Sequence, residues 1–440
     1  MKGFLLIMFL VLSSLLSSLS LFQVSAGTGQ EIIRVPVDYP TIQEAINAAA
    51  SGSIILVHAG TYYEHLVINK TLTLIGEDKA TTIIDGNKTG TVVRVKANNV
   101  TINGFTLRNG EIGLHLGHYN SSIISNNIIA FNEQCGILLN HSSSNLIDRN
   151  LILRNGNPLP GFSYGEGIRM VLSNNNTISG NVVDWNVVCG IVLMSSCSNL
   201  VVNNIIERSV NGIAIEGNAS KNNLIYHNNF IWNNFHVDFL TSGVHPPNFW
   251  DDGSVGNYWD DYVGLDDGSG GRVAGDGVGD TDLPHLGVDK YPLINPLGPI
   301  PVVWENREYP VTVASNFTVS EFRFVQTEKK ITFKVRGANA AVGFCNITIP
   351  KTLLRGEPWK LLLDTTDITS EAIITENTTH TLIHFTCSNS TAFNVQIIGT
   401  WVIPELPSPL TLSLFIIFST FIIVLIKTKS RKKNQPKPTF

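Results

Sequence analysis

The fold is decided by a six-residue motif that recurs along the middle of the chain. Ile124-Ser-Asn-Asn-Ile-Ile129 returns as Ile147-Asp-Arg-Asn-Leu-Ile152 and as Ile178-Ser-Gly-Asn-Val-Val183, and related segments begin at Ile102, Val201 and Ile225. These starts lie 22 to 24 residues apart, except for one step of 31 between Ile147 and Ile178. A second motif follows each of the first five: Gly113-Leu-His-Leu116, Gly136-Ile-Leu-Leu139, Gly167-Ile-Arg-Met170, Gly190-Ile-Val-Leu193 and Gly212-Ile-Ala-Ile215. A repeat of this length predicts a solenoid.

The kind of solenoid follows from the local pattern. Each unit contains short apolar pieces separated by Asn, Gly and Ser, and none shows the spacing of an amphipathic helix. The Leu-x-x-Leu-x-Leu frame of leucine-rich repeats is missing as well. Short strands joined by tight Asn/Gly bends predict a parallel β-helix, an all-β fold whose rungs stack about 4.8 Å apart.

Stacking also explains the abundance of Asn. Five Asn residues fall three positions after the start of their motif and should superpose at one bend, where Asn tolerates a left-handed backbone and can bond its neighbours in a ladder. These are Asn127, Asn150, Asn181, Asn204 and Asn228. A second expected ladder is Asn132, Asn155, Asn186 and Asn233. We interpret both ladders as structural.

Two segments depart from the repeat, one inserted on a face of the coil and one at its first end. The 31-residue step carries about eight extra residues within 155–165, which must loop out from one face, often the binding face. Before the repeats, residues 41–49 predict a short helix with Thr41 as N-cap and Glu44 as its capping-box partner. We expect this helix to cover the apolar end of the coil.

Both ends of the chain read as targeting segments. Lys2, an apolar run and small residues up to Ala26 predict a signal peptide over 1–26. Residues 410–426 carry no charge and precede a basic cluster at 427–440, which predicts a single transmembrane anchor with a cytoplasmic tail. A Pro-rich spacer occupies 404–409. The chain is thus expected to be a single-pass protein of the cell membrane. Its N-terminal side, which makes up the bulk of the chain, is expected to lie outside the cell. The Asn-x-Ser/Thr sequons are consistent with an exported glycoprotein.

Between the repeats and the spacer the composition changes. Residues 299–403 contain seven strand-like runs and little Asn, which predicts a β-sandwich that serves as a stalk. The runs are 311–314, 331–335, 345–349, 359–363, 372–375, 381–386 and 393–398. Cys345 and Cys387 in this part either pair or stay free, whereas Cys135 and Cys189 lie two rungs apart, about 10 Å, too far for a disulfide.

Several of these motifs resemble a known class. Thr41-Ile-Gln-Glu-Ala-Ile-Asn47, Val57-His-Ala-Gly-Thr-Tyr-Tyr-Glu64 and Leu72-Thr-Leu-Ile-Gly76 resemble the opening of right-handed parallel β-helix proteins of the pectin-lyase-like class. The Asn/Ile rungs resemble NosD-like repeats of carbohydrate-binding and sugar-hydrolysis proteins, and Gly256-Asn-Tyr-Trp-Asp-Asp-Tyr262 is similar to the tail of exported, often archaeal, NosD-like proteins. The resemblance covers residues 33–297. It implies this fold over 27–298 but several functions, among them an accessory role in copper-enzyme maturation.

The net charge of the chain bears on whether it binds nucleic acid. The formal net charge is −5 and only 15% of residues are charged. A nucleic-acid binder would need a basic surface to neutralise phosphates, so we exclude nucleic acid as a partner.

The acidic tail at 248–298 is a candidate metal site. Ten Asp and one base, Arg272, lie between Asn248 and Asp289. Hard oxygen ligands on Gly-rich loops suit Ca²⁺, and a solvated acidic loop is the alternative. The candidate ligands are Asp276, Asp280 and Asp282, followed by Asp266 and Asp267.

A polysaccharide site is the other candidate. Alternation from each repeat Gly predicts an outward column of His115, Leu138, Arg169, Val192, Ala214 and His236. The catalytic candidates are Glu166, Arg169 and Asp184, and the candidate ligand contacts are Tyr164, Glu166 and Arg169. Glycosidase chemistry needs two opposed carboxylates, and no such motif is visible.

Copper is disfavoured on sequence grounds. Soft Cu(I) sites use Met and Cys, whereas Met170 and Met194 have the pattern of core residues. The three His at His227, His236 and His245 could still cluster near the last rungs. The favoured function is a cell-surface β-helix that binds carbohydrate or an envelope polymer without turnover. The alternatives are a polysaccharide lyase or hydrolase, and a NosD-type accessory protein for a copper enzyme.

Overall fold

The computed structural model describes residues 31–157, 165–240, 247–304, 307–337, 342–388 and 392–403. The expected signal peptide, Pro-rich spacer and membrane anchor lie outside these ranges. No helix in the described part of the chain has the length and apolar character needed to cross a bilayer.

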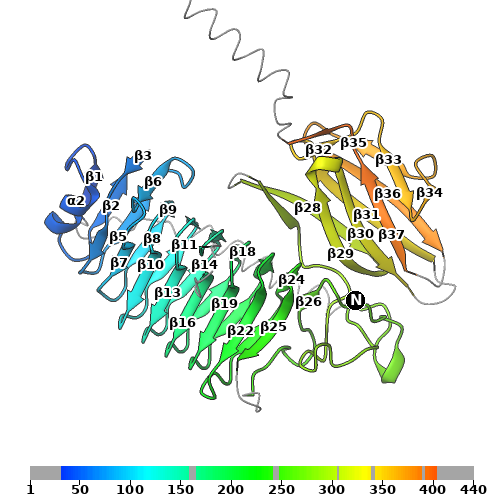
Figure 1. Cartoon of the computed structure of the whole chain (residues 1–440), viewed down its shortest axis with the longest axis horizontal. Coiled ribbons are helices and arrows are strands. Elements are labelled where there is room, and N and C mark those ends of the chain that lie inside the picture. Colours follow the sequence, from blue (N-terminus) through cyan, green and yellow to red (C-terminus); the bar gives the residue numbers. More distant parts are fainter. Residues whose placement is uncertain are drawn as a thin grey trace, which may run out of the picture.

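The first half of the chain winds into a right-handed coil of three parallel sheets (Figure 1). Sheet one contains β1 (Ile32–Val35), β2 (Ile54–Val57), β5 (Thr73–Gly76), β8 (Thr101–Asn103), β11 (Ile123–Ser125), β14 (Leu146–Asp148), β17 (Thr177–Ser179), β20 (Leu200–Val202) and β23 (Leu224–Tyr226). Sheet two contains β4 (Leu66–Ile68), β7 (Thr91–Val95), β10 (Ile112–Gly117), β13 (Cys135–Asn140), β16 (Glu166–Val171), β19 (Cys189–Met194), β22 (Asn211–Glu216) and β25 (Phe235–Leu240). Sheet three contains β3 (Gly60–Tyr62), β6 (Thr82–Asp85), β9 (Thr106–Arg108), β12 (Ile128–Ala130), β15 (Leu151–Leu153), β18 (Val182–Asp184), β21 (Ile205–Glu207), β24 (Asn229–Ile231) and β26 (Tyr258–Trp259).

The repeat motifs superpose as predicted. Ile124 pairs with Ile147, Ile147 with Ile178, and the column continues through Val201 to Ile225. All five side chains are fully buried, so each rung adds one aliphatic layer to a continuous core. The fold class is therefore confirmed for the coil.

The first Asn ladder is confirmed in detail. The Oδ1 of Asn150 accepts from the backbone N and the Nδ2 of Asn127, at 3.0 and 3.1 Å, and each later rung repeats this geometry up to Asn228. The ladder extends one step further to Asn257, whose backbone N donates to Asp289 at 2.8 Å. A third ladder, which the sequence reading missed, runs through Asn145, Asn176, Asn199, Asn223 and Asn248.

Two details of the ladder prediction were wrong. The second ladder is interrupted after Asn186, because Ser209 occupies the next rung and donates its backbone N to Asn233. The left-handed backbone falls on the residue before each ladder Asn, for example on Asn126 and Arg149, with φ of 53° and 52°. This placement leaves the amide free to reach neighbouring backbone groups, as Asn150 does with Ile124.

A single helix, α2 (Ile42–Ala48), covers the first end of the coil (Figure 1). Thr41 caps it by accepting from the backbone N of Glu44, as predicted. The reciprocal capping-box bond from the backbone N of Thr41 to the carboxylate of Glu44 is not formed among the described residues. The carboxylate of Glu64 instead accepts from the backbone N of Ile42 and of Gln43. Helix α2 is thus hydrogen-bonded to the turn of the coil that it covers.

After the coil, the short η1 (Ser269–Gly271) lies in the acidic tail, and the second domain then forms two five-stranded antiparallel sheets. The first contains β27 (Ile300–Trp304), β28 (Arg307–Ser315), β31 (Val342–Pro350), β36 (His380–Ser388) and β35 (Ile373–Glu376). The second contains β29 (Thr318–Val325), β30 (Lys330–Arg336), β37 (Phe393–Ile398), β33 (Lys360–Leu363) and β34 (Thr366–Asp367). A two-stranded sheet of β32 (Leu354–Arg355) and β38 (Trp401–Val402), and η2 (Gln326–Glu328), complete it. All seven predicted strands are present.

The second domain packs on the last rungs of the coil. The hydroxyl of Tyr258 donates to the carbonyl of Val319, and Thr318 donates to the carbonyl of Gly264, at 2.9 and 2.6 Å. Val303 on β27 contacts an apolar cluster on the outer face of sheet three. Both domains therefore share buried surface, and this contact shapes the cleft described below.

The cysteines are all free thiols in the described chain. Cys135 and Cys189 flank Glu166 on successive rungs, as the two-rung prediction requires. Cys345 and Cys387 lie on the neighbouring strands β31 and β36 without a bond, so the open alternative of a disulfide is not realised.

Candidate functional site

A column of large side chains follows the bend between sheet three and sheet two. Each member precedes the second-ladder position of its rung, and each has a left-handed backbone, with φ between 50° and 59°. The members are Phe131, Arg154, Trp185, Arg208 and Trp232. Phe131 and Trp185 are 38% and 53% exposed, so both rings present apolar surface to solvent. We call this set the bend column.

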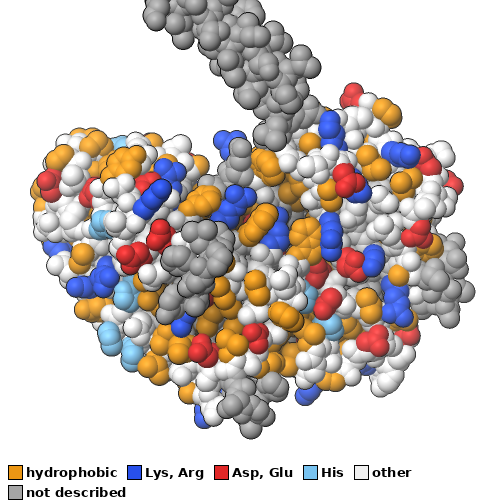
Figure 2. Space-filling model, viewed as in Figure 1, with side chains coloured by type: hydrophobic (Ala, Val, Ile, Leu, Met, Phe, Trp, Pro, Cys, Tyr) orange, Lys and Arg blue, Asp and Glu red, His pale blue; other side chains and the backbone are white. Residues whose placement is uncertain are grey.

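Cationic and aromatic side chains alternate along the bend column. The guanidinium carbons of Arg154 and Arg208 lie 5.3 and 5.6 Å from the centre of the Trp185 ring. Arg323 of the second domain lies 5.2 Å from the centre of the Trp232 ring and continues the alternation. On the face drawn in Figure 2, basic and hydrophobic side chains alternate where the coil meets the second domain. Cation–π contacts hold the aromatic rings in place.

Two adjoining clefts run along the bend column. The smaller, about 340 Å³, is lined by Trp185, Val187, Arg208 and Val210, among others. The larger, about 860 Å³, lies between the coil and the second domain. Trp232 and Asn234 line both, so the clefts form one groove.

The insertion predicted to mark a binding face adjoins this groove. Gly156 and Gly165, two described residues of the insertion, lie so close to Val187 that a Cβ on either would come within 2.9 Å of that side chain. The predicted contact Tyr164 falls in 158–164, outside the described residues.

A buried ion network anchors Arg208. Its guanidinium donates two hydrogen bonds to Asp184, at 2.8 and 2.9 Å, and one to Glu207 at 2.9 Å. Both carboxylates are almost fully buried. Burial raises the pKa of Glu207 to about 8. The positive charge of Arg208 lowers this pKa, and the negative charge of Asp184 raises it further. The network therefore fixes Arg208 rigidly under Trp185.

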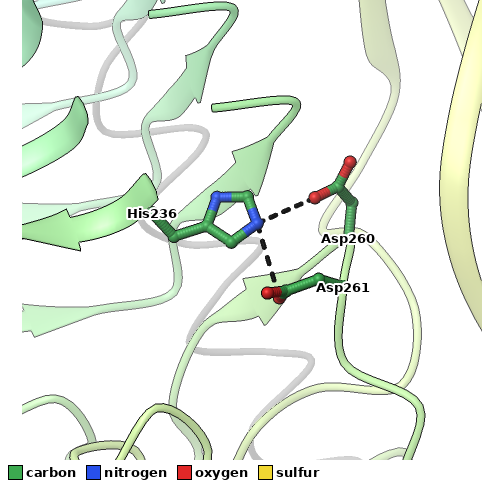
Figure 3. Close-up of side chains that lie close together, drawn as sticks. All are labelled: His236, Asp260 and Asp261. Carbon is green, nitrogen blue, oxygen red and sulfur yellow. Dashed lines mark ion pairs between the residues drawn. The ribbon is translucent and has the colours of Figure 1, made fainter. Parts of the chain in front are cut away.

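The far end of the groove contains a His and two Asp side chains (Figure 3). The Nε2 of His236 lies 2.9 Å from Asp260 and 3.4 Å from Asp261. His285 binds the same Asp261 oxygen at 2.9 Å, and the second oxygen of Asp260 accepts from the backbone N of Trp232. Asp260 also joins the domains, since its carbonyl accepts from the backbone N of Glu321.

Electrostatics within this trio are strong. Burial would lower the pKa of His236, but the hydrogen bonds and charges of Asp260 and Asp261 outweigh burial and raise that pKa to about 9. For Asp261, burial acts to raise the pKa, yet the bonds from His236 and His285 hold it well below its usual range. His236 is therefore cationic at neutral pH, sits between two carboxylates, and is poorly suited to act as a base.

The outward column of sheet two is confirmed for its first five members. His115, Leu138, Arg169, Val192 and Ala214 are paired in register. The sixth position was wrong, because Ala214 pairs with Asp238 and His236 falls in the column of repeat glycines. The prediction failed because the step from Ala214 to Asp238 is 24 residues, two more than the 22 residues from Val192 to Ala214.

Glu166 and Arg169 form an ion pair at 2.6 Å on β16, with Glu166 nearly buried. Asp184 lies instead on sheet three and pairs with Arg208, so the three catalytic candidates do not form one group. Met170 is a core residue as predicted, but Met194 is partly exposed, with its sulfur 3.6 Å from Arg169.

The acidic tail uses its carboxylates to bind backbone amides. Asp266 accepts from the backbone N of Gly275 and of Gly277, and Asp280 accepts from that of Gly268. Asp276 and Asp267 each bond a backbone N two residues ahead, and Asp282 has a left-handed backbone with φ of 54°. Ca²⁺ binding by these five residues stays a prediction.

The bend column was not predicted from the sequence. Its signal was available, because Trp185 and Trp232 directly precede ladder Asn residues, a position that faces away from the core. The distant Arg323 and the His236–Asp260 contact had no such signal, since they depend on how the second domain packs.

The fold and its groove define a right-handed parallel β-helix protein. Residues 46–264, which span most of the coil, match the family described as "Periplasmic copper-binding protein (NosD)". A cell surface glycoprotein of Methanothermus fervidus is 31% identical over 123 residues, which are 28% of this chain and 21% of that protein. The chain thus matches about a fifth of the length of this relative.

Two solved structures are similar to parts of this chain at low sequence identity. An alginate lyase from Paenibacillus sp. str. FPU-7 has 16% identity and a TM-score of 0.42, with 52% of this chain and 87% of that chain covered. The Dettilon tailspike protein has 15% identity and a TM-score of 0.33, with 83% and 94% covered.

The family description raises the question of copper. Within the described residues, one group of three or more His, Cys, Asp or Glu side chains has its ligand atoms within 4.8 Å of one another, namely His236, Asp260 and Asp261. One imidazole and two hard carboxylates do not match the soft ligands that Cu(I) prefers. His227 is not part of this group and lies in a tilted ring contact with Tyr226, and His245 lies outside the described residues. The trio therefore does not fit a Cu(I) site.

Proposed function

We propose that this protein acts outside the cell and binds an extended carbohydrate or envelope polymer in the groove along the bend column. The observation that carries the proposal is the exposed, immobilised Trp185 with an Arg on each side. Aromatic rings of the bend column recur on every second rung, about 10 Å apart, a distance comparable with the length of a disaccharide. Such rings offer flat apolar surface for the faces of successive sugars, while Arg154 and Arg323 offer hydrogen-bond donors.

An extracellular location is supported by two descriptions. The matched family is described as periplasmic, and the relative is described as a cell surface glycoprotein. A single-pass anchor at 410–426 would hold the groove near the envelope, as the sequence predicts. Glycosylation at the Asn-x-Ser/Thr sequons and membrane anchoring at 410–426 are parts of this proposal.

Binding without cleavage is our preferred form of the function. A cationic His236 between two carboxylates does not offer the free base that proton abstraction needs. The alternative, a lyase or hydrolase, would use the ion-paired Glu166 and Arg169 on sheet two. An accessory role in copper-enzyme maturation finds no support in the hard donor set of the trio.

The test is polymer binding by the full chain and by variants of the bend column. A panel of neutral and acidic soluble polysaccharides would be examined by affinity electrophoresis. We expect Trp185→Ala and Trp232→Ala to weaken binding about tenfold or more, since each removes a stacking surface worth roughly 1.5 kcal/mol. Tyr63→Ala is the matched control, because Tyr63 is 71% exposed and lies outside the groove.

Product formation would be followed on the same polymers by reducing ends and unsaturated-sugar absorbance. Binding that depends on Trp185 without new products supports the proposal. Turnover that disappears in Arg169→Ala would contradict it and support the enzyme alternative.

A further inference from the structure

A second cleft lies on the outer face of sheet two, toward the first end of the coil. Its volume is about 310 Å³, and it is lined by Arg94, Val95, Lys96, His115, Gly117, His118, Tyr119 and Asn140. None of these described lining residues is acidic, in a chain whose net charge is −5. Figure 2 shows His side chains gathered beside Lys and Arg at one edge of the coil.

The strand register explains why this surface is hollow. Arg94 on β7 pairs with His115 on β10, so their outward side chains are neighbours about 4.8 Å apart. Gly117 lies two residues after His115, on the same face of the sheet. It pairs with Asn140 of β13 on the next rung, and Lys96 lies on the rung before it. Because Gly117 has no side chain, space is left beside the imidazole. A Cβ there would lie 3.1 Å from the Nε2 of His115.

The imidazole of His115 lacks protein partners. Both ring nitrogens are shielded from solvent, and neither has a hydrogen-bond partner in the described structure. A neutral imidazole carries one N–H donor, and an unsatisfied buried donor costs roughly 1–3 kcal/mol. Burial, together with Arg94 and His118, lowers the pKa of His115, so the positive charge here comes from Arg94 and Lys96.

The two cations are also uncompensated. Arg94 donates one hydrogen bond, to the hydroxyl of Thr91 at 3.1 Å, and forms no ion pair in the described structure. Lys96 is exposed and likewise has no described carboxylate within ion-pair distance. Two cations and one N–H donor thus converge on a hollow without a counter-charge. Tetrahedral oxyanions are bound by this combination, because each oxygen can accept from a different donor.

We propose that the cleft of Arg94, Lys96, His115 and Gly117 binds a sulfate or phosphate group. Arg94 and Lys96 supply the charge, and His115 donates a hydrogen bond to one oxygen in the space beside Gly117. This site lies several rungs from the groove and does not depend on the proposed function. The group is either a free anion or a substituent of an envelope polymer.

The experiment measures binding by the full chain with inorganic sulfate and inorganic phosphate in calorimetric titrations. We expect Arg94→Gln to weaken binding at least tenfold. Gly117→Ala should weaken it similarly without changing any charge, because its methyl group occupies the hollow. Lys221→Gln, which removes an exposed cation elsewhere on the coil, is the matched control and should bind like the wild type.

A parallel arm compares dextran sulfate with neutral dextran. Binding of the inorganic anions assigns a site for the free group, whereas binding of dextran sulfate alone assigns a polymer substituent; either result supports the proposal if Gly117→Ala removes it. The proposal is overturned if none of the charged probes binds, or if Gly117→Ala, with an unchanged melting temperature, binds like the wild type. Polymer binding at Trp185 is measured separately, so failure here leaves that result intact.

Discussion

The guanidinium of Arg208 lies 5.6 Å from the centre of the Trp185 ring while it donates two hydrogen bonds to Asp184. One side chain therefore connects the buried ion network of sheet three to the exposed ring of the groove. The planar fork of Arg is needed for both contacts, and Lys offers only a point charge. We expect Arg208→Lys to weaken polymer binding about threefold to tenfold in affinity electrophoresis.

The control for this prediction is Arg149→Lys. Arg149 has the same left-handed backbone at the bend between sheet one and sheet three, its side chain is 70% exposed, and it binds the neighbouring Asp148. Its replacement should leave polymer binding unchanged. Equal losses in both variants would contradict a specific role for Arg208.

The Asn ladder should dominate the stability of the coil. Asn150 accepts two hydrogen bonds from Asn127, and its own amide reaches Ile124. Asn150→Ala leaves several buried polar groups without partners, so we expect a loss of about 3–5 kcal/mol in the free energy of unfolding. Denaturant unfolding measures it. Asn47→Ala on the exposed face of α2 should change the same quantity by less than about 0.5 kcal/mol.

The sequence could predict the coil because each rung repeats the same physical requirements. Aliphatic residues such as Ile147 and Ile178 recur at core positions, and Asn150 and Asn181 recur where a buried bend needs amides. The groove was harder to predict, because it depends on contacts between distant parts of the chain. Arg323 reaches Trp232 only through the packing of the second domain, and a step two residues longer than the preceding one places Asp238, not His236, in the expected column.

Calcium binding by the acidic tail predicts a stability that depends on chelation. If Asp276, Asp280 and Asp282 hold Ca²⁺, EDTA should lower the melting temperature, since a bound ion stabilises the folded state. Asp280→Asn should then be insensitive to EDTA. A melting temperature that EDTA leaves unchanged in the wild type would favour the alternative of a solvated loop whose carboxylates bind backbone amides.

Glu207 should make stability fall as pH rises. Its pKa is about 8 in the folded state and 4.5 ordinarily, so the folded state binds the proton more tightly. Stability from this group is fully present below pH 4.5 and is lost progressively up to about pH 8. Glu207→Gln keeps the shape and an acceptor for Arg208, and it should flatten the fall in melting temperature across this range. The exposed Glu133→Gln should retain the wild-type slope.

His236 should add a second, more alkaline loss of stability. Its pKa is raised from 6.5 to about 9 by Asp260 and Asp261, so its contribution is complete below pH 6.5 and disappears as pH rises through 9. His236→Gln should be less stable than the wild type at pH 6 and should lose little more between pH 6.5 and 9. His65→Gln, an exposed substitution on the coil, serves as the control.

Because the carbonyl of Asp260 also accepts a hydrogen bond from the backbone N of Glu321 in the second domain, the loss of stability at high pH should first loosen the contact between the domains. Hydrogen exchange at the backbone N of Glu321 would detect this loosening. A melting temperature of His236→Gln that runs parallel to the wild type over this pH range would show that the imidazole is not held as a cation between the two carboxylates.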